Sequence, residues 1–161
     1  MDREEYADKL ALSGEPEKAM AVMKERKWTV AVDFDGVLHS YTTPWLNAHT
    51  IPDPPVPGAI EWLHSTVQTF NVAIYSTRSK TWRGRRAMKA WLKKHAGNIY
   101  WEAPGFLGLE DVTFSAEKPP ALVYVDDRAY RFTGDNFPTQ DEIHNLRPWN
   151  KGRKDRQNGK P

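Results

Sequence analysis

The stretch Val30-Ala31-Val32-Asp33-Phe34-Asp35-Gly36-Val37-Leu38 joins a short apolar run to two carboxylates and a glycine. A short apolar run that ends at a turn signal predicts a buried strand followed by a loop. In an open α/β sheet, ligands bind outside the carboxyl ends of the strands. Asp33 and Asp35 are therefore expected at the edge of a crevice, where Gly36 permits a turn that a side chain would obstruct.

Two carboxylates this close in sequence repel each other unless a positive charge lies between them. A hard divalent cation such as Mg²⁺ is the usual partner, because it prefers oxygen ligands. The alternative is that the Asp-x-Asp-Gly sequence is only a polar turn at the end of a strand. This stretch by itself does not separate the two interpretations.

Two later apolar runs also end in polar residues. One leads from Asn71 into Ser76 and Thr77, and the other leads into Asp126 and Asp127. Helices are expected at 59–70 and about 80–94, a further strand at 98–101, and a helical turn near 140–146. Strands that alternate with helices in this way predict an α/β fold with a Rossmann-like parallel sheet flanked by helices.

The remaining segments set the domain organisation. Good helix formers in residues 3–26 are interrupted at Gly14 and Pro16, which predicts two short helices in an N-terminal extension, 1–27, packed on the core. The catalytic domain is expected at 28–146, and a basic, flexible tail at 147–161. Five prolines between His39 and Pro57 exclude a regular helix there and predict a loop or flap near the crevice mouth, with Trp45 available to stack on a base or to pack on the core.

Composition narrows the class of protein. The 161 residues are 39% hydrophobic and 12% aromatic, which is typical of a globular domain. The absence of cysteine excludes disulfides, thiolate zinc sites and a cysteine nucleophile. With no apolar run of membrane-spanning length and no secretory signal pattern, we expect a cytoplasmic protein that does not interact with membranes.

Basic residues are concentrated in two places. Residues 78–94 contain eight Lys or Arg and no acid, and residues 147–161 contain six against one Asp. Arg78, Arg83 and Arg86 lie around the expected start of the second helix, a position that opposes the helix dipole. A positive rim beside a carboxylate crevice indicates an anionic substrate, most simply a phosphate ester; a solvated basic helix face is the alternative. The basic tail could likewise add affinity for a phosphate backbone or be an ordinary solvated terminus.

Taken together, the strand-end residues resemble the four motifs of the haloacid dehalogenase superfamily. The first motif is met by Asp33-Phe34-Asp35-Gly36-Val37-Leu38, and the second by Ile74-Tyr75-Ser76. Lys118 best matches the lone lysine of the third, and Val123-Tyr124-Val125-Asp126-Asp127 matches the fourth. The resemblance covers roughly residues 28–135, and its first and fourth motifs are the specific ones.

The resemblance implies a role for each of these residues. Asp33 would be the nucleophile that forms an aspartyl-phosphate, and Asp35 the general acid and base. Ser76 or Thr77, with Lys118, would hold the phosphoryl oxygens. Mg²⁺ would be bound by Asp33, the backbone carbonyl of Asp35, and the pair Asp126 and Asp127, with Asp127 the likelier direct ligand.

An acid two residues after the nucleophile distinguishes the phosphatases of this superfamily from its dehalogenases. The intervals between motifs leave no room for a large cap domain, and the sequence Asp126-Asp127-Arg128 is similar to the fourth motif of 5′(3′)-deoxyribonucleotidases and polynucleotide kinase phosphatase domains. The resemblance therefore implies a Mg²⁺-dependent phosphatase acting on a nucleotide or on a nucleic-acid 3′- or 5′-phosphate, with Arg78, Arg83, Arg86 and Trp45 as substrate-binding residues. The alternatives are a catalytically weak nucleic-acid-binding module and a small-metabolite or phosphoprotein phosphatase.

Overall fold

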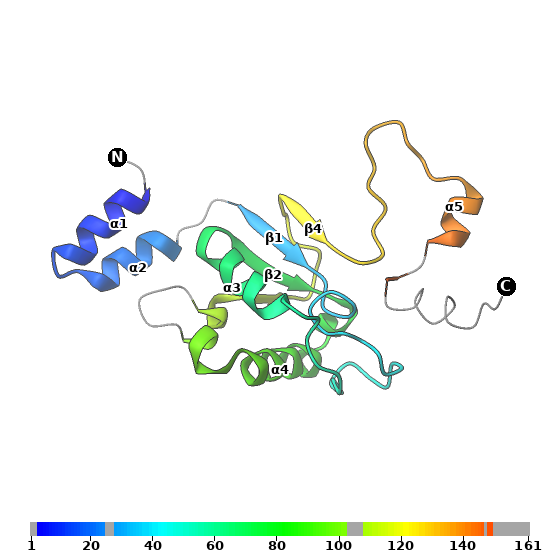
Figure 1. The fold of residues 1–161 in the computed structure, drawn as a ribbon, viewed down its shortest axis with the longest axis horizontal. Coiled ribbons are helices and arrows are strands. Elements are labelled where there is room, and N and C mark those ends of the chain that lie inside the picture. Colours follow the sequence, from blue (N-terminus) through cyan, green and yellow to red (C-terminus); the bar gives the residue numbers. More distant parts are fainter. Residues whose placement is uncertain (1–2, 25–27, 103–107, 147, 150–161) are drawn as a thin grey trace.

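A four-stranded parallel sheet forms the centre of the computed structural model, which describes residues 3–24, 28–102, 108–146 and 148–149 (Figure 1). The strands are β1 (Thr29–Val32), β2 (Asn71–Tyr75), β3 (Thr113–Ser115) and β4 (Val123–Val125). Their order across the sheet is β3-β2-β1-β4, and every pairing is parallel. The predicted α/β fold with a Rossmann-like parallel sheet flanked by helices is therefore confirmed at this level.

Two helices cover one face of the sheet (Figure 1). Helix α3 (Ala59–Thr69) connects β1 to β2, and helix α4 (Trp82–Trp101) follows β2 after the short 3-10 turn η1 (Thr77–Lys80). Alternate strand residues point toward these helices, as the two-residue period of a strand requires. The resulting apolar core includes Val30, Val32, Val72, Ile74, Leu63, Val67, Met88, Trp91 and Leu92.

Residues 98–101 are helical, so the strand predicted there is wrong. They form the last turn of α4, after a non-helical residue at Gly97, whose φ is 61°. Trp101 is buried, and its packing decides the conformation of a short apolar run that is ambiguous by sequence. The third strand is instead β3, which follows the 3-10 turn η2 (Leu109–Asp111).

The connection from β3 to β4 crosses the sheet in only seven residues, 116–122, without a helix. The apolar side chains of Leu122, Val123 and Tyr124 remain substantially exposed. Parallel sheets are ordinarily covered on both faces. Among the residues that the structure describes, a full helical layer covers only one face of this sheet.

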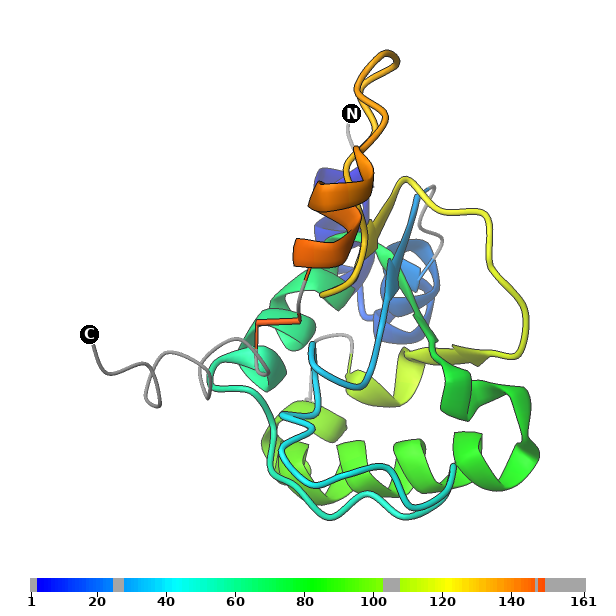
Figure 2. The same cartoon turned by 90° about the vertical axis from the view of Figure 1, so that its right-hand side faces the viewer.

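The flap, residues 39–57, runs beside α4 as a loop without a regular helix, as predicted (Figure 2). The Trp91 indole of α4 donates a hydrogen bond of 3.0 Å to the Asp53 carbonyl. Backbone bonds from Ser40 to Pro54 and from Val56 to Leu38 close the base of the loop. The flap is consequently attached both to the helical layer and to the segment that follows β1.

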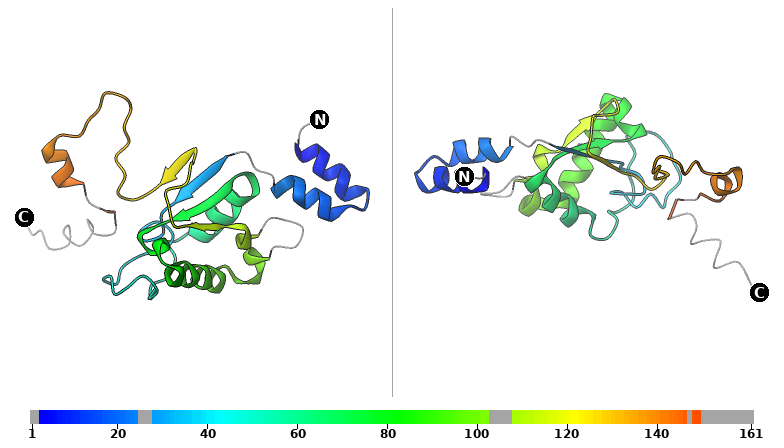
Figure 3. Two further views of the ribbon diagram at one scale, coloured as in Figure 1. Left: turned by 180° about the vertical axis from the view of Figure 1, so that it is seen from behind. Right: turned by 90° about the horizontal axis from the view of Figure 1, so that it is seen from above.

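The two ends of the described chain lie at opposite ends of the molecule (Figure 3). Helices α1 (Arg3–Leu12) and α2 (Pro16–Lys24) form the predicted pair of short helices and pack against each other, burying Ala7 and Ala19. At the other end, α5 (Gln140–Asn145) is exposed along its length, and residues 150–161 of the predicted tail lie outside the described residues. Among the described helices, none has the length and apolar character that a membrane crossing needs.

Candidate active site

Three carboxylates converge at the carboxyl ends of β1 and β4. Val32 pairs with Val125, so Asp33 and Asp126 leave neighbouring strands at the same level, and the Asp33 N–H donates to the Val125 carbonyl at 2.9 Å. Asp33, Asp126 and Asp127 each place a carboxylate oxygen within 4.8 Å of the other two. We call these three residues the carboxylate cluster; they are three of the four residues predicted to bind a metal.

The side chain of Asp127 is shielded from solvent. It is 3% exposed, and neither carboxylate oxygen has a hydrogen-bond partner among the described residues. Its nearest cation is the Arg128 Nε atom at 3.9 Å. Burial raises the pKa of Asp127, because an ionised carboxylate is costly to remove from water unless it is paired.

Gly36 allows the loop after β1 to pass directly over Asp127. Its φ is +89°, and a Cβ atom at this position would lie 2.5 Å from the Asp127 Oδ2 atom. Both the backbone conformation and the close approach therefore require glycine. Gly36 thus brings the loop after β1 against the Asp127 side chain.

Asp33 has an environment suited to a reactive carboxylate. Burial raises its pKa to about 6, and the negative charges of Asp126 and Asp35 act in the same direction. The Phe34 N–H, 2.6 Å from Oδ1, and a hydrogen bond with Ser76 act in the opposite direction. Asp33 is therefore ionised at neutral pH and held in place by two donors.

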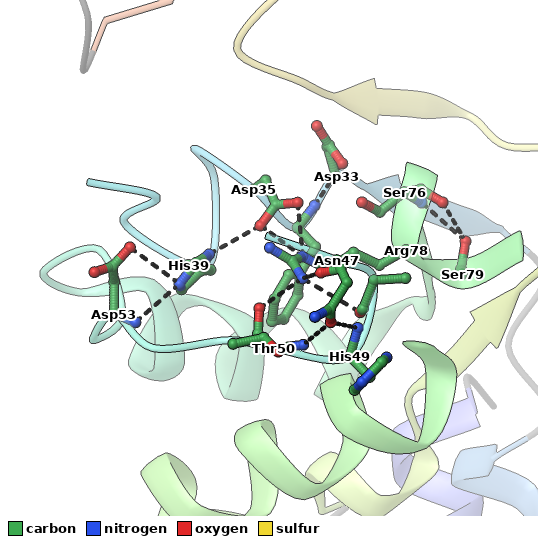
Figure 4. A network of polar contacts seen from close by, with 12 residues as sticks. Asp33, Asp35, His39, Asn47, His49, Thr50, Asp53, Ser76, Arg78 and Ser79 are labelled. Atoms are coloured by element: carbon green, nitrogen blue, oxygen red, sulfur yellow. Dashed lines mark hydrogen bonds and ion pairs between the residues drawn. The ribbon is translucent and has the colours of Figure 1, made fainter. Parts of the chain in front are cut away.

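The carboxylate of Asp35 faces Arg78 and His39 (Figure 4). It accepts two hydrogen bonds from Arg78 Nε, at 2.9 and 2.8 Å, and Oδ1 lies 2.9 Å from His39 Nδ1. Asp33 and Asp35, two residues apart in sequence, thus have separate partners. Metal binding through the backbone carbonyl of Asp35 stays a prediction.

Arg78 does not lie on the exposed basic rim that the sequence suggested. Arg78 is 1% exposed, and its guanidinium lies 4.4 Å from the Trp45 ring centroid. Nη1 donates to three flap carbonyls, those of Asn47, Ala48 and Thr50, at 2.9, 3.2 and 2.9 Å. Arg78 lies in η1, three residues beyond the end of β2, and its side chain binds Asp35 and the flap inside the protein.

His39 and Asp53, to which the sequence analysis assigned no role, extend this network. His39 is fully buried, and its Nε2 accepts a hydrogen bond of 3.2 Å from the Asp53 backbone N–H. Nδ1 therefore carries the ring proton and donates a hydrogen bond to Asp35. Asp53 in turn accepts from the Thr43 hydroxyl and backbone N–H at 2.6 and 2.8 Å, and hydrogen bonds with Thr43 help to lower its pKa despite the opposing effect of burial.

Of the two hydroxyls proposed for the second motif, Ser76 is the one that contacts Asp33. It is buried at the end of β2, and the pairing of Val32 with Ile74 sets it beside the end of β1. Thr77 is exposed at the start of η1. The arrangement therefore favours Ser76 as the hydroxyl that faces the cluster.

Lys118 lies in the crossover between β3 and β4. Its Nζ atom is 4.6 Å from the centroid of the Tyr124 ring, and the side chain is exposed. Tyr124 alternates with the core-facing Val125, so this contact is on the sheet face away from α3 and α4. In the part of the chain that the structure describes, no contact joins Lys118 to the carboxylate cluster.

Arg83 and Arg86 are exposed on α4, as expected for a basic rim. The Arg83 guanidinium lies 5.5 Å from the Trp82 ring centroid. Arg86 lines a hollow of about 430 Å³, which is bounded by Arg86, Lys89, Ala90, Lys93, Trp101, Glu102 and Glu110. Trp45, the fourth predicted substrate-binding residue, is 42% exposed on the flap above Arg78.

No protein-family model, curated protein or solved structure matches this chain. Its fold and its carboxylate cluster therefore define the class: an α/β protein with a Rossmann-like parallel sheet and an acidic site at the carboxyl edge of that sheet.

Proposed function

We propose that the protein is a Mg²⁺-dependent phosphatase of the haloacid dehalogenase type. The single observation that carries the proposal is the cluster of Asp33, Asp126 and Asp127, in which neither oxygen of the buried Asp127 side chain has a hydrogen-bond partner among the described residues. Such a carboxylate requires a cation close by. The cluster lies at the edge of the sheet where α/β proteins bind ligands, and its member Asp33 is the carboxylate available as a nucleophile.

The residues present fit a hard divalent cation. All three side chains of the cluster offer carboxylate oxygens, the ligands that Mg²⁺ prefers, and the exposure of Asp126 leaves room for water or substrate. When bound, Mg²⁺ would neutralise negative charge and help to orient the phosphoryl group. The pKa values of Asp33 and Asp127 are raised, as expected for metal-binding carboxylates when no cation offsets their burial and the repulsion from neighbouring carboxylates.

In the proposed reaction, an Asp33 oxygen attacks phosphorus and the bond from phosphorus to the ester oxygen breaks. For the departing alkoxide to take up a proton from Asp35, this carboxylate must first turn away from Arg78 and be protonated by solvent; water then hydrolyses the aspartyl-phosphate after losing a proton to Asp35. In the structure, Arg78 and His39 hold the Asp35 carboxylate through both of its oxygens, so the acid–base role depends on release of these contacts when substrate binds. Ser76 orients Asp33 and lies where it can donate to a phosphoryl oxygen.

We infer that the substrate is a nucleotide or the phosphorylated end of a nucleic acid. Helix α4 carries six Lys or Arg and no acid, and it begins at the edge of the sheet that carries the cluster. An exposed basic helix next to a phosphate site would attract a polyanionic substrate.

The test is phosphate release from p-nitrophenyl phosphate and from a panel of mononucleotides, 3′- and 5′-phosphorylated oligonucleotides, sugar phosphates and phosphopeptides. Activity should require Mg²⁺, stop on addition of EDTA, and fall by at least about 10³-fold in Asp33→Asn. Asp135→Asn, which changes an exposed loop carboxylate, serves as the control and should retain wild-type activity. Full activity in Asp33→Asn would refute the nucleophile assignment, and oligonucleotide binding without turnover of any substrate would favour a binding module instead.

A further inference from the structure

The segment after α5 returns to the proposed active site. Figure 2 shows residues 148–149, in red, beside the loop that follows β1, although the two are far apart in sequence. The Trp149 indole N–H donates a hydrogen bond of 2.5 Å to the Gly36 carbonyl. Gly36 is adjacent to Asp35 and packed against Asp127, so this contact reaches the centre of the first motif.

A hollow of about 260 Å³ lies between this returning segment and the end of β4. It is lined by Asp127, Arg128, Ala129, Leu146 and Pro148. Asp127 belongs both to the hollow and to the carboxylate cluster, so the hollow begins where a phosphoryl group at the cluster would end. The position of its outer wall is set by Trp149 and by the capped end of α5, where Leu146 N–H donates to the Glu142 carbonyl at 2.9 Å.

We propose that this hollow binds the leaving group of the phosphate ester, and that Trp149 is the positioning residue that holds its outer wall. The inference rests on the proposed phosphatase function. A volume of about 260 Å³ is just below the usual range of ligand pockets, which begins at about 300 Å³, and it accommodates one ring of the size of a sugar. Leu146 and Pro148 offer apolar contact to the ring, while Arg128, with 55% of its side chain exposed, offers a cation to a second polar or anionic group.

The lining thus selects a phosphate ester of a single sugar-sized ring that carries another acceptor, as in a nucleotide or a sugar phosphate. The shared chemistry is the ring and its phosphate. Nucleotides and sugar phosphates differ in the group attached beyond the sugar ring, so an experiment with both classes distinguishes them. The chain itself, and not a separate cap domain, provides this wall of the site.

The experiment compares Leu146→Trp, which fills the hollow, with Trp149→Ala and Trp149→Phe. Trp149→Phe keeps a ring but removes the N–H donor. The control is Trp62→Ala on α3, which removes a tryptophan of similar exposure, 40% against 43%. Substrates are a nucleoside monophosphate, ribose 5-phosphate, and acetyl phosphate, whose leaving group is too small to reach the far wall.

Leu146→Trp and Trp149→Ala should raise KM for the ring esters roughly ten-fold or more and leave kcat/KM for acetyl phosphate within about two-fold. Trp149→Phe should give a smaller rise, and Trp62→Ala none. Equal effects on ring esters and acetyl phosphate, or no effect on either, would overturn the proposal. A preference for the nucleotide over ribose 5-phosphate identifies the nucleotide as the source of the ring.

Binding in an Asp33→Asn background separates this proposal from the proposed function. Calorimetric titration of the nucleoside monophosphate and of ribose 5-phosphate, with Mg²⁺ present, needs no turnover. If the ring esters bind and Leu146→Trp abolishes that binding, the hollow is a ligand site even when the wild-type protein hydrolyses nothing. If neither ring ester binds, or if Leu146→Trp leaves binding unchanged, the assignment of the hollow is wrong regardless of any phosphatase activity.

Discussion

Replacing Arg78 by methionine should be among the most destabilising single changes in the chain. Methionine retains most of the side-chain volume but removes the two bonds to Asp35 and the three to flap carbonyls. Breaking a buried ion pair by removing one partner costs about 3–5 kcal/mol, because the other charge stays buried without compensation. The Asp35 side chain is only 12% exposed, so this estimate applies.

The assay is equilibrium unfolding in urea. For an m-value of about 2 kcal/mol/M, the midpoint of Arg78→Met should fall by about 1.5–2.5 M. Arg78→Lys should lose less, since an ammonium can reach Asp35 but cannot also bond the flap as a guanidinium does. The matched control is Arg83→Met on the exposed surface of α4, which should stay within about 0.5 kcal/mol of wild type.

A double-mutant cycle identifies the cause of the loss. Asp35→Asn combined with Arg78→Met should be less destabilised than the sum of the two single changes by at least about 1 kcal/mol, because the double variant buries no unpaired charge. A loss below about 1 kcal/mol in Arg78→Met, or strict additivity in the cycle, would refute the view that Arg78 holds Asp35 and the flap together.

Two further predictions concern the carboxylate cluster. Without metal, the pKa of Asp33 in the folded protein is about 6, against an ordinary value of 3.8, so its contribution to folding stability falls as pH rises between these values, by at most about 3 kcal/mol. Asp33→Asn should therefore raise Tm in EDTA at pH 7 but not at pH 3.5; an equal difference at both pH values would contradict the raised pKa. Gly36→Ala should cost about 1–3 kcal/mol more in urea unfolding than Gly58→Ala. Gly58 has a similar φ of +81° but open space around its Cβ position, so equal losses would show that the contact with Asp127 carries no penalty.

The parts of the site that follow from strand periodicity could be predicted from sequence. Asp33, Ser76 and Asp126 each come directly after an apolar run, and parallel pairing brings such residues to one edge. Their mutual placement follows from the sheet alone. Side-chain direction does not, and Arg78 shows the difference: its position after β2 could be predicted, whereas its burial depends on where the flap carbonyls lie.

The residues without a sequence signal depend on contacts between loops. His39 and Asp53 meet only because the proline-rich flap folds back on its own base. Trp149 lies in a stretch expected to be a flexible tail, and its bond to Gly36 comes from a segment more than a hundred residues away. β3 has three residues, one exposed and two half-buried, which is too short for a periodic pattern. The only sequence hints were that His39 and Trp149 are residues able to pack in the interior while lying among polar neighbours.

The bonds of Arg78 also have a consequence for the order of folding. They connect residues 28 to 43 positions apart, all of them earlier in the chain than Arg78 itself. Loop closure over such separations is slow unless a paired strand has already brought the ends together. During synthesis, the flap therefore cannot acquire its final shape until β2 has emerged and joined β1. A pulse-labelling hydrogen-exchange experiment should find the amides of β1 and β2 protected before those of residues 43–50.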